Sequence, residues 1–284
     1  MMEEKKKILV VLAHPDDETF GMGGTLAYYA SQGVEVHLIC ATRGEAGEVS
    51  IPQMQGFNSK GELREAELRC AVEALGLKEV YFLDYRDSGM QGASENDHPN
   101  ALMAQPVGEV AAKIVHRIRE IKPQVVITFD PVGGYHHPDH IAIHKATVMA
   151  FQAAGNTDQF LDGLAPFRPD KLYYHVFPRR FMRIVVILMR MLGKDPTRFG
   201  RNKDIDLEQL ANDEDYPRHI SINYHEVADL LFQATLCHAS QLDVGRRTPR
   251  LLSWLNKLSR RKDYFMQAYP EVTAKYHAKD FFAK

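Results

Sequence analysis

The stretch "ILVVLAHPDDE", residues 8–18, contains the main evidence for the fold. Its first six residues form a continuous apolar run, which is expected of a strand buried on both faces of a parallel sheet. A histidine and three acidic residues follow where this run ends. Residues 23–33 then predict a helix that ends at Gly33. A strand, a polar turn and a helix in this order are typical of an α/β protein.

The same alternation continues along the chain. Strands are predicted at 34–42, 79–85 and 125–130, and helices at 62–76 and 107–121. Such alternation implies right-handed crossovers and a mostly parallel sheet with helices on both faces. In sheets of this kind, ligands bind at the carboxyl ends of the strands, where the strand order reverses. We therefore expect an α/β fold with its site at that edge.

Beyond residue 150 the pattern is less regular. We expect a strand at 171–177 and a helix at 226–241. Between them, residues 179–203 mix apolar residues with eight Lys or Arg and predict a helical insertion that packs on the domain or on another subunit. A substrate lid and a peripheral contact with anionic lipid are the alternatives. No linker is evident, so we expect one domain over 1–284, with a motif-bearing core at about 8–150 and a C-terminal extension.

Composition and charge indicate which partners and which cellular location to expect. The chain has 35 Lys and Arg against 37 Asp and Glu, a net charge of −2, so we expect small-molecule partners and no nucleic acid. The N-terminal apolar run is short and ends in His-Pro-Asp-Asp, which predicts no signal peptide and a cytoplasmic protein. No segment is long enough to predict a stable membrane span, and a homo-oligomer is compatible with the sequence. The three cysteines are widely spaced, so we predict buried thiols without a disulfide at Cys40, Cys70 and Cys237.

Two polar clusters point to a metal site. His14 and Asp17 are three residues apart at a predicted strand-to-helix turn, a spacing that lets both side chains bind one ion. A catalytic zinc usually has three protein ligands and one open position, so a third ligand is needed. The second cluster, "GGYHHPDHIAIH", offers four candidates, and helical spacing does not choose among them: His136, His137, His140 and His144.

Other side chains of the two clusters are candidates for the acid, base and oxyanion-binding roles of a hydrolysis reaction. Asp16, beside Asp17, is a candidate general base for an attacking water, with a helix N-cap as the alternative role. A protonated His137 would stabilise an oxyanion and donate a proton to a leaving amine, and Asp139 would orient this imidazole and keep it charged. Tyr135, on a glycine-flanked loop, could donate its hydroxyl to the same oxygen.

With these residues assembled, the chain resembles the PIG-L/LmbE-like family of zinc-dependent N-deacetylases, which includes deacetylases of mycothiol and bacillithiol synthesis. The matching motifs lie within residues 8–150 and are "AHPDDE" at 13–18, "TRGEAGE" at 42–48, "GELREAELRCAVEALG" at 61–76, "DYRDSGM" at 84–90 and "GGYHHPDH" at 133–140. The paired HPDDE and HPDH motifs are highly specific, and the others support them.

The resemblance implies a Rossmann-like domain and assigns the site. It places Zn²⁺, with Fe²⁺ as the alternative, on His14, Asp17 and His140. It also implies Asp16 as general base and His137 as the electrophilic or acid partner.

Three further residues are assigned by the resemblance to substrate binding. Arg64 and Asp87 would hold the sugar. In "QATLCHASQ", residues 233–241, Gln233 stands where the family often has lysine, and His238 would approach the pocket.

The leading hypothesis is therefore a metal-dependent hydrolase that removes the N-acetyl group from an N-acetylglucosamine-type sugar conjugate. An amidase for a larger thiol conjugate or another acyl amide is the alternative. A non-catalytic sugar- or nucleotide-binding module is a third hypothesis, although the first strand is not followed by G-x-G-x-x-G.

Overall fold

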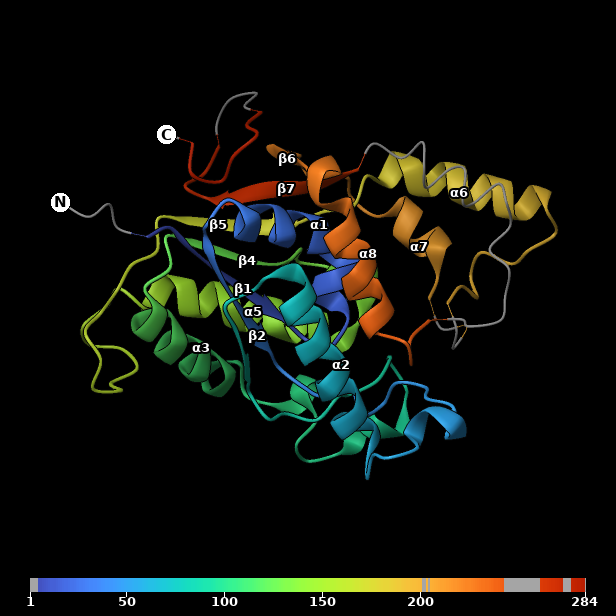
Figure 1. The fold of residues 1–284 in the computed structure, drawn as a ribbon, viewed down its shortest axis with the longest axis horizontal. Helices are drawn as coiled ribbons and strands as arrows, with labels where there is room; N and C mark the ends of the chain where they lie inside the picture. Colours follow the sequence, from blue (N-terminus) through green and yellow to red (C-terminus); the bar gives the residue numbers. More distant parts are fainter. Residues whose placement is uncertain (1–4, 201–202, 204, 243–260, 273–276, 284) are drawn as a thin grey trace.

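The protein forms one seven-stranded mixed sheet in the order β3-β2-β1-β4-β5-β7-β6. The structure is a computed structural model, and it describes residues 5–200, 203, 205–242, 261–272 and 277–283. The strands, coloured along the chain in Figure 1, are β1 (Lys7–Leu12), β2 (Glu35–Cys40), β3 (Glu79–Phe82), β4 (Val125–Phe129), β5 (Lys171–His175), β6 (Ile220–Asn223) and β7 (Lys262–Tyr269). The α/β architecture predicted from the sequence is confirmed.

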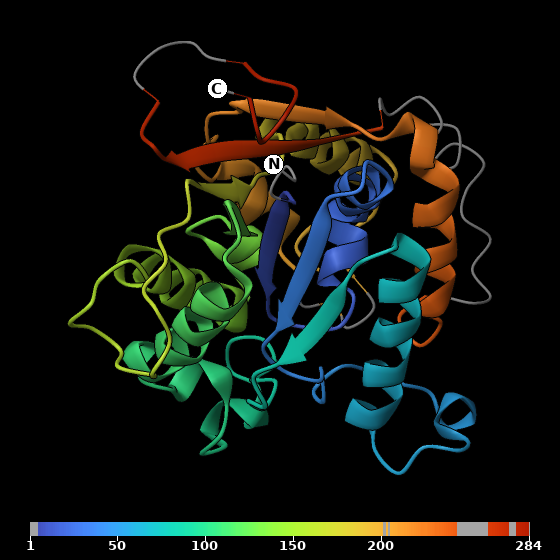
Figure 2. The same cartoon turned by 60° about the vertical axis from the view of Figure 1, so that its left-hand side comes forward.

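The first five strands are parallel, and their order reverses beside β1. The chain runs outward from β1 through β2 to β3 and then returns to place β4 on the other side of β1. Figure 2 shows β1, β2 and β3 side by side with their arrowheads at the same edge. A crevice forms between loops that leave such a switch point in opposite directions. The ends of β1 and β4 are therefore where a site is expected.

Helices cover both faces of the sheet. They are α1 (Asp17–Ser31), α2 (Lys60–Leu75), α3 (Val107–Ile121), α4 (Gly133–His136), α5 (Pro138–Ala153), α6 (Arg179–Met191), α7 (Leu207–Asn212) and α8 (Ala228–Cys237). In Figure 2, α3 and α5 pack together on one side of the sheet, and α1, α2 and α8 pack on the other. Figure 1 shows that α6 projects from this body beside α7.

Local sequence explains where these elements begin and end. The residues from Ile8 to Leu12 are fully buried, as the apolar run predicted for a central strand. Helix α2 begins after Ser59, whose hydroxyl accepts a hydrogen bond from the Glu62 amide at 3.1 Å, and it ends at Gly76 with φ 72°. Helix α3 has the predicted bounds. Among the described residues, no helix is long and apolar enough to cross a bilayer.

Beyond residue 150, the observed helices and strands differ more from those predicted from the sequence. The strand expected at 171–177 ends at 175, and the helix expected at 226–241 becomes α8, ten residues long. The insertion contains α6, and its residues 201–202 lie outside the described part. Strands β6 and β7 were not predicted: β7 runs antiparallel between β5 and β6. Strand β6 has only four residues, three of them buried, and the side chains of β7 are mostly half-buried, so neither has the continuous apolar run that reveals a central parallel strand.

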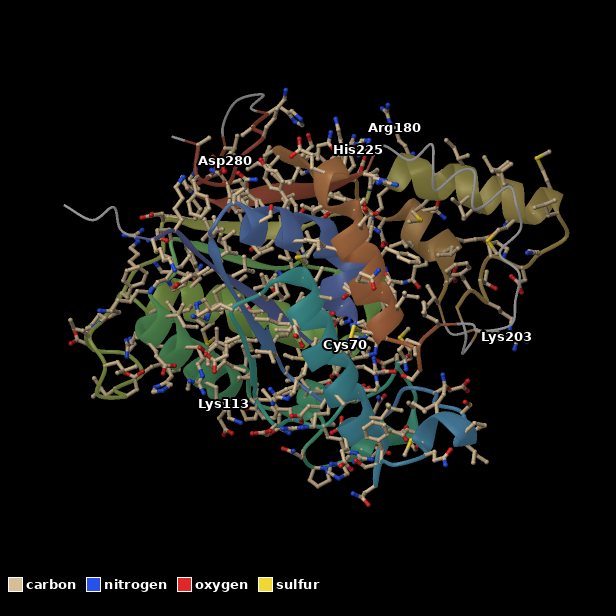
Figure 3. All side chains as sticks on the ribbon, viewed as in Figure 1. Cys70, Lys113, Arg180, Lys203, His225 and Asp280 are labelled. Carbon is tan, nitrogen blue, oxygen red and sulfur yellow. A yellow bond between two sulfur atoms is a disulfide. The ribbon has the colours of Figure 1, made fainter. Side chains whose placement is uncertain are left out.

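The prediction of three unpaired thiols is wrong for two of them. Cys70 on α2 and Cys237 at the end of α8 form a disulfide across 167 residues, and Figure 3 shows the sulfur atoms at Cys70, between the two helices. Cys40 is a free, buried thiol, as predicted. Spacing along the chain could not reveal the pair, because packing of α2 against α8 brings the two residues together.

We expect replacement of Cys70 by serine to lower the free energy of unfolding by about 2–4 kcal/mol, because the cross-link restricts the unfolded chain. Urea unfolding with and without a reductant measures this. The reductant should destabilise the wild-type protein and leave a Cys70→Ser/Cys237→Ser variant unchanged. Three titratable thiols in the denatured, unreduced protein would show that the cross-link does not form.

Candidate active site

The polar residues of both motifs meet at the switch point between β1 and β4. His14 lies two residues beyond the end of β1, and α1 begins at Asp17. On the other side, His137 caps α5: its Nδ1 accepts a hydrogen bond from the backbone N–H of Asp139 at 3.2 Å. This cap fixes where α5 begins and directs His140, in its first turn, towards His14. Two segments more than a hundred residues apart therefore form one cluster.

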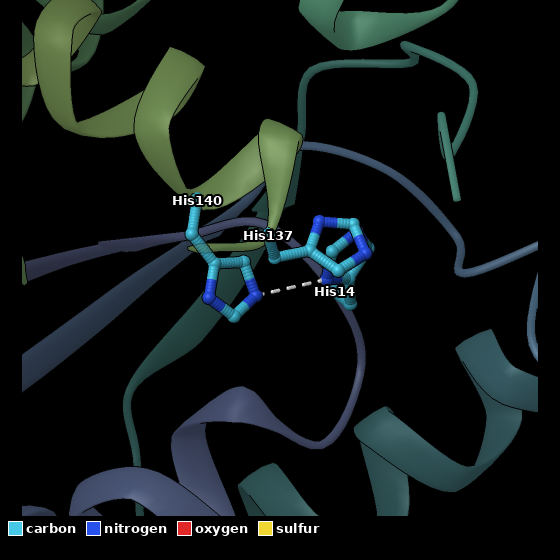
Figure 4. A group of neighbouring side chains, drawn as sticks. All are labelled: His14, His137 and His140. Carbon is cyan, nitrogen blue, oxygen red and sulfur yellow. Dashed lines mark hydrogen bonds between the residues drawn. The ribbon is translucent and has the colours of Figure 1, made fainter. Parts of the chain in front are cut away.

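Three side chains form a compact triangle of donor groups in this cluster. Nε2 of His140 lies 3.2 Å from Nδ1 of His14 and 3.2 Å from Oδ1 of Asp17, and His14 Nδ1 lies 3.5 Å from Asp17 Oδ2. Figure 4 marks the contact between His140 and His14 with a dashed line. A tetrahedral ion with bonds of about 2.0–2.1 Å holds its donor atoms about 3.3–3.4 Å apart. The two imidazole nitrogens and the Asp17 carboxylate therefore have the spacing expected of ligands to one small metal ion.

The hydrogen bonds of the other ring nitrogens show which nitrogen of each histidine is available to a metal ion. His140 donates from Nδ1 to the Gly133 carbonyl at 3.2 Å, and His14 donates from Nε2 to Asp139 at 3.1 Å. In the neutral form of both rings these hydrogen bonds leave His14 Nδ1 and His140 Nε2 as acceptors, facing each other across 3.2 Å. A positive charge between these two nitrogens, a proton or a metal ion, is stabilised by both. Outer hydrogen bonds of this kind orient the histidines of metal sites.

The electrostatics of the cluster also favour a cation. Burial lowers the pKa of His14, but the nearby carboxylates, chiefly Asp87 with Asp139 and Asp17, outweigh it and raise that pKa well above its ordinary value. Burial would raise the pKa of Asp17, yet His140 and His14 hold it well below the usual range. Asp17 is therefore ionised, and the pocket around His14 attracts positive charge.

The structure shows which of the four candidate histidines of the second motif lie near His14. His137 and His140 both lie near His14, with ligand atoms within 4.8 Å of one another. His136 turns away to Asp213, 2.8 Å distant, and His144 donates to the Phe129 carbonyl at 2.9 Å.

Asp16 lies beside the triangle in an unusual backbone conformation. Its φ of 117° is rarely adopted by L-residues. Asp16 occupies the N-cap position of α1, as the alternative expected, but its side chain makes no capping hydrogen bond there. Instead, its carboxylate accepts a hydrogen bond from Arg64 at 2.9 Å. Burial and the neighbouring Asp17 raise the pKa of Asp16 to about 6, although Arg64 opposes the shift. Asp16 is thus deprotonated at neutral pH and remains a competent base.

The expected pairing of Asp139 with His137 is wrong. The Asp139 carboxylate contacts His14 and accepts hydrogen bonds from the amide and hydroxyl of Ser88, and only its backbone N–H reaches His137. Burial, with His14 and His140, lowers the pKa of His137 well below its usual value, so no carboxylate keeps this ring charged. Because His137 Nδ1 accepts a hydrogen bond, Nε2 carries the proton of the neutral ring.

The other predicted residues surround this centre. The ring of Tyr135 lies edge-on to those of His137 and His140, with centroids 5.9 and 5.1 Å away. Arg64 and Asp87 are buried, and Asp87 lies 3.4 Å from His14 Nε2 and accepts a hydrogen bond from the Gly89 amide. That Arg64 and Asp87 hold a sugar stays a prediction.

His238 reaches the site through Glu18. Its Nε2 lies 2.7 Å from a Glu18 oxygen, and the other Glu18 oxygen accepts a hydrogen bond from the Asp16 amide. Sequence reasoning gave no role to Glu18 or to Ser88. Glu18 is the third acid of the first motif, and its position was the only available signal. Ser88 lies in the quoted motif at 84–90, but that motif gave no indication of its partner, because Asp139 is 51 residues away.

Comparisons with known proteins agree with this geometry. The chain is 38% identical over 214 residues to a 1D-myo-inositol 2-acetamido-2-deoxy-alpha-D-glucopyranoside deacetylase of Geodermatophilus obscurus, covering 72% of each chain. It is 37% identical over 248 residues to the protein of the same name from Acidothermus cellulolyticus, covering 84% of this chain and 80% of the relative.

A solved structure has the same fold. The N,N'-diacetylchitobiose deacetylase from Pyrococcus horikoshii aligns with a TM-score of 0.63 and 22% identity, over 93% of this chain and 84% of that one. The sequence pattern of the PIG-L family, described as GlcNAc-PI de-N-acetylase, matches residues 9–151, which is half of the chain and includes every member of the donor triangle. The chain therefore belongs to the PIG-L family.

Proposed function

We propose that the protein is a metal-dependent hydrolase that removes the N-acetyl group from an N-acetylglucosamine conjugate, with N-acetylglucosaminyl-inositol as the first substrate to test. The observation that carries this proposal is the donor triangle of His14, Asp17 and His140 with Asp16 beside it. The names of the relatives supply the substrate class.

Zinc is the proposed ion because two imidazole nitrogens and one carboxylate are its usual ligands in hydrolases, and Fe²⁺ is the alternative. Bound there, zinc would polarise the amide carbonyl and lower the pKa of water. His14, Asp17 and His140 would hold it. Asp139 and the Gly133 carbonyl would orient the two rings through their other nitrogens.

Asp16 would act as the general base. Its carboxylate is held by Arg64 rather than by the helix, so no capping hydrogen bond occupies it. It would accept a proton from the attacking water and return it to the leaving amine. Arg64 also donates to the Gly44 carbonyl at 2.8 Å, which ties the base to the loop that follows β2.

His137 would stabilise the oxyanion as a neutral hydrogen-bond donor. The cap on α5 uses its Nδ1 as acceptor, which leaves the Nε2 proton available for the amide oxygen. Tyr135, whose ring lies beside that of His137, would add its hydroxyl.

The test is release of primary amine by the zinc-loaded protein from a set of amides. We expect turnover of N-acetylglucosaminyl-inositol, with N-acetylglucosamine and N,N'-diacetylchitobiose as smaller comparisons. Parallel loading with Fe²⁺ under anaerobic conditions compares the two ions. Turnover of bulky acylated thiol conjugates alone would support the amidase alternative. If metal-loaded protein releases amine from none of these amides, the proposed function is wrong.

A further inference from the structure

Helix α6 carries an apolar stripe on its outer face. The stripe consists of Ile184, Ile187, Leu188 and Met191 in the helix and Leu192 at its C-cap. Their positions, i, i+3, i+4, i+7 and i+8, lie on one side of a helix. The exposed fractions of these side chains range from 39 to 77%. Figure 1 shows the helix standing out from the body of the protein. Five exposed apolar residues in one row are more than the scattered ones of an ordinary surface.

Packing against α7 holds the stripe outward. Arg183 Nε donates a hydrogen bond to the Ala211 carbonyl at 2.9 Å, and Arg190 pairs with Glu208. At its start, Arg179 is buried and lies 3.4 Å from both the Asp130 carboxylate and the Gly134 carbonyl. The helix is therefore anchored at its start and along its inner side.

The charge around the stripe is strongly positive. Residues 180–200 contain five basic residues and a single acid, Asp195, although the whole chain has a net charge of −2. The basic residues are Arg180, labelled in Figure 3 near the start of α6, Arg183, Arg190, Lys194 and Arg198. Helix α8 is a useful contrast, since it exposes Leu230, Phe232 and Leu236 but has no basic residue. Apolar exposure and positive charge coincide at α6.

We propose that α6 docks on an anionic phospholipid bilayer, with the stripe in the interface and the side chains of Arg180, Lys194 and Arg198 at the headgroups. An amphipathic helix with Lys and Arg beside a bulky apolar face has the chemistry that such a surface binds. With 13 residues the helix is about 20 Å long, too short to span the bilayer. A symmetric contact between two copies would bring like charges together, which disfavours self-association.

Docking would also place the candidate site near the bilayer. The carbonyl that Arg179 approaches belongs to Gly134 in α4, the short helix that directly precedes His137. The proposal does not depend on the reaction catalysed, because vesicle binding is measured without a substrate.

The test is co-sedimentation of the whole protein with vesicles of phosphatidylcholine alone or mixed with phosphatidylglycerol. We expect binding to the mixed vesicles only, weakened by salt. Ile187→Glu should lower the partition coefficient by about tenfold or more, because it places a charge in the stripe. Phe232→Glu is the matched control, since Phe232 has the same exposed fraction of 58% on α8, and it should bind like wild type.

Charge reversal tests the electrostatic part. Lys194→Glu with Arg198→Glu should lower the partition coefficient by about tenfold or more, since each basic residue near the surface contributes about fivefold. Lys78→Glu, an exposed lysine outside the insertion, should change it little. The proposal is wrong if wild type binds neither kind of vesicle or if Phe232→Glu weakens binding as much as Ile187→Glu. A dimer in light scattering that Ile187→Glu dissociates, without vesicle binding, would identify the stripe as a contact between copies.

Discussion

Replacing Asp16 with asparagine should lower kcat by about 10²–10⁴-fold, the usual contribution of a general base. Asparagine keeps the size of the side chain and tolerates the left-handed backbone, but it cannot accept the proton of the attacking water. The hydrogen bond from Arg64 is retained through the amide oxygen. Metal content and the unfolding transition should therefore stay close to wild type while amine release falls.

Asp84→Asn is the matched control for this measurement. Asp84 also has a positive φ, 61°, and its carboxylate also pairs with an arginine, Arg43, at 2.6 Å. It lies on the surface, so its variant should retain wild-type turnover. A metal-loaded Asp16→Asn protein with wild-type kcat would exclude Asp16 as the base.

The second large effect is expected from His140→Gln. Loss of one corner of the donor triangle should weaken metal binding by at least about 100-fold, beyond the 10–100-fold that outer-shell changes typically cost. Amine release should fall in proportion to the metal that remains bound. Equilibrium dialysis followed by elemental analysis measures this directly, independently of any substrate.

His144→Gln separates loss of a ligand from damage to the helix. His144 is also buried and lies one turn further along α5, but its ring donates to the Phe129 carbonyl instead of facing His14. Its variant should bind metal like wild type even if it unfolds more easily. Equal metal loss in both variants would mean that the fold of α5, rather than the His140 nitrogen, determines binding.

Much of the core fold was predictable because the relevant signals are local. The apolar run before His14 defines a buried strand, and the bounds of α3 follow from its helical periodicity and the proline after it. The antiparallel strands β6 and β7 carry no comparable signal, since their neighbours and not their own pattern decide that they pair. The same holds for the disulfide between Cys70 and Cys237.

For the site, the sequence by itself determined that His14, Asp16 and Asp17 stand together where β1 ends, because adjacent residues cannot separate. Only the tertiary structure decided which second-motif histidine meets them. The Gly133 carbonyl orients the ring of His140 towards His14, whereas the Phe129 carbonyl holds His144 away. The tertiary structure also decided that the Asp139 carboxylate contacts His14 rather than the neighbouring His137. Side-chain partners depend on where distant backbone acceptors lie, and that is set by packing of whole elements.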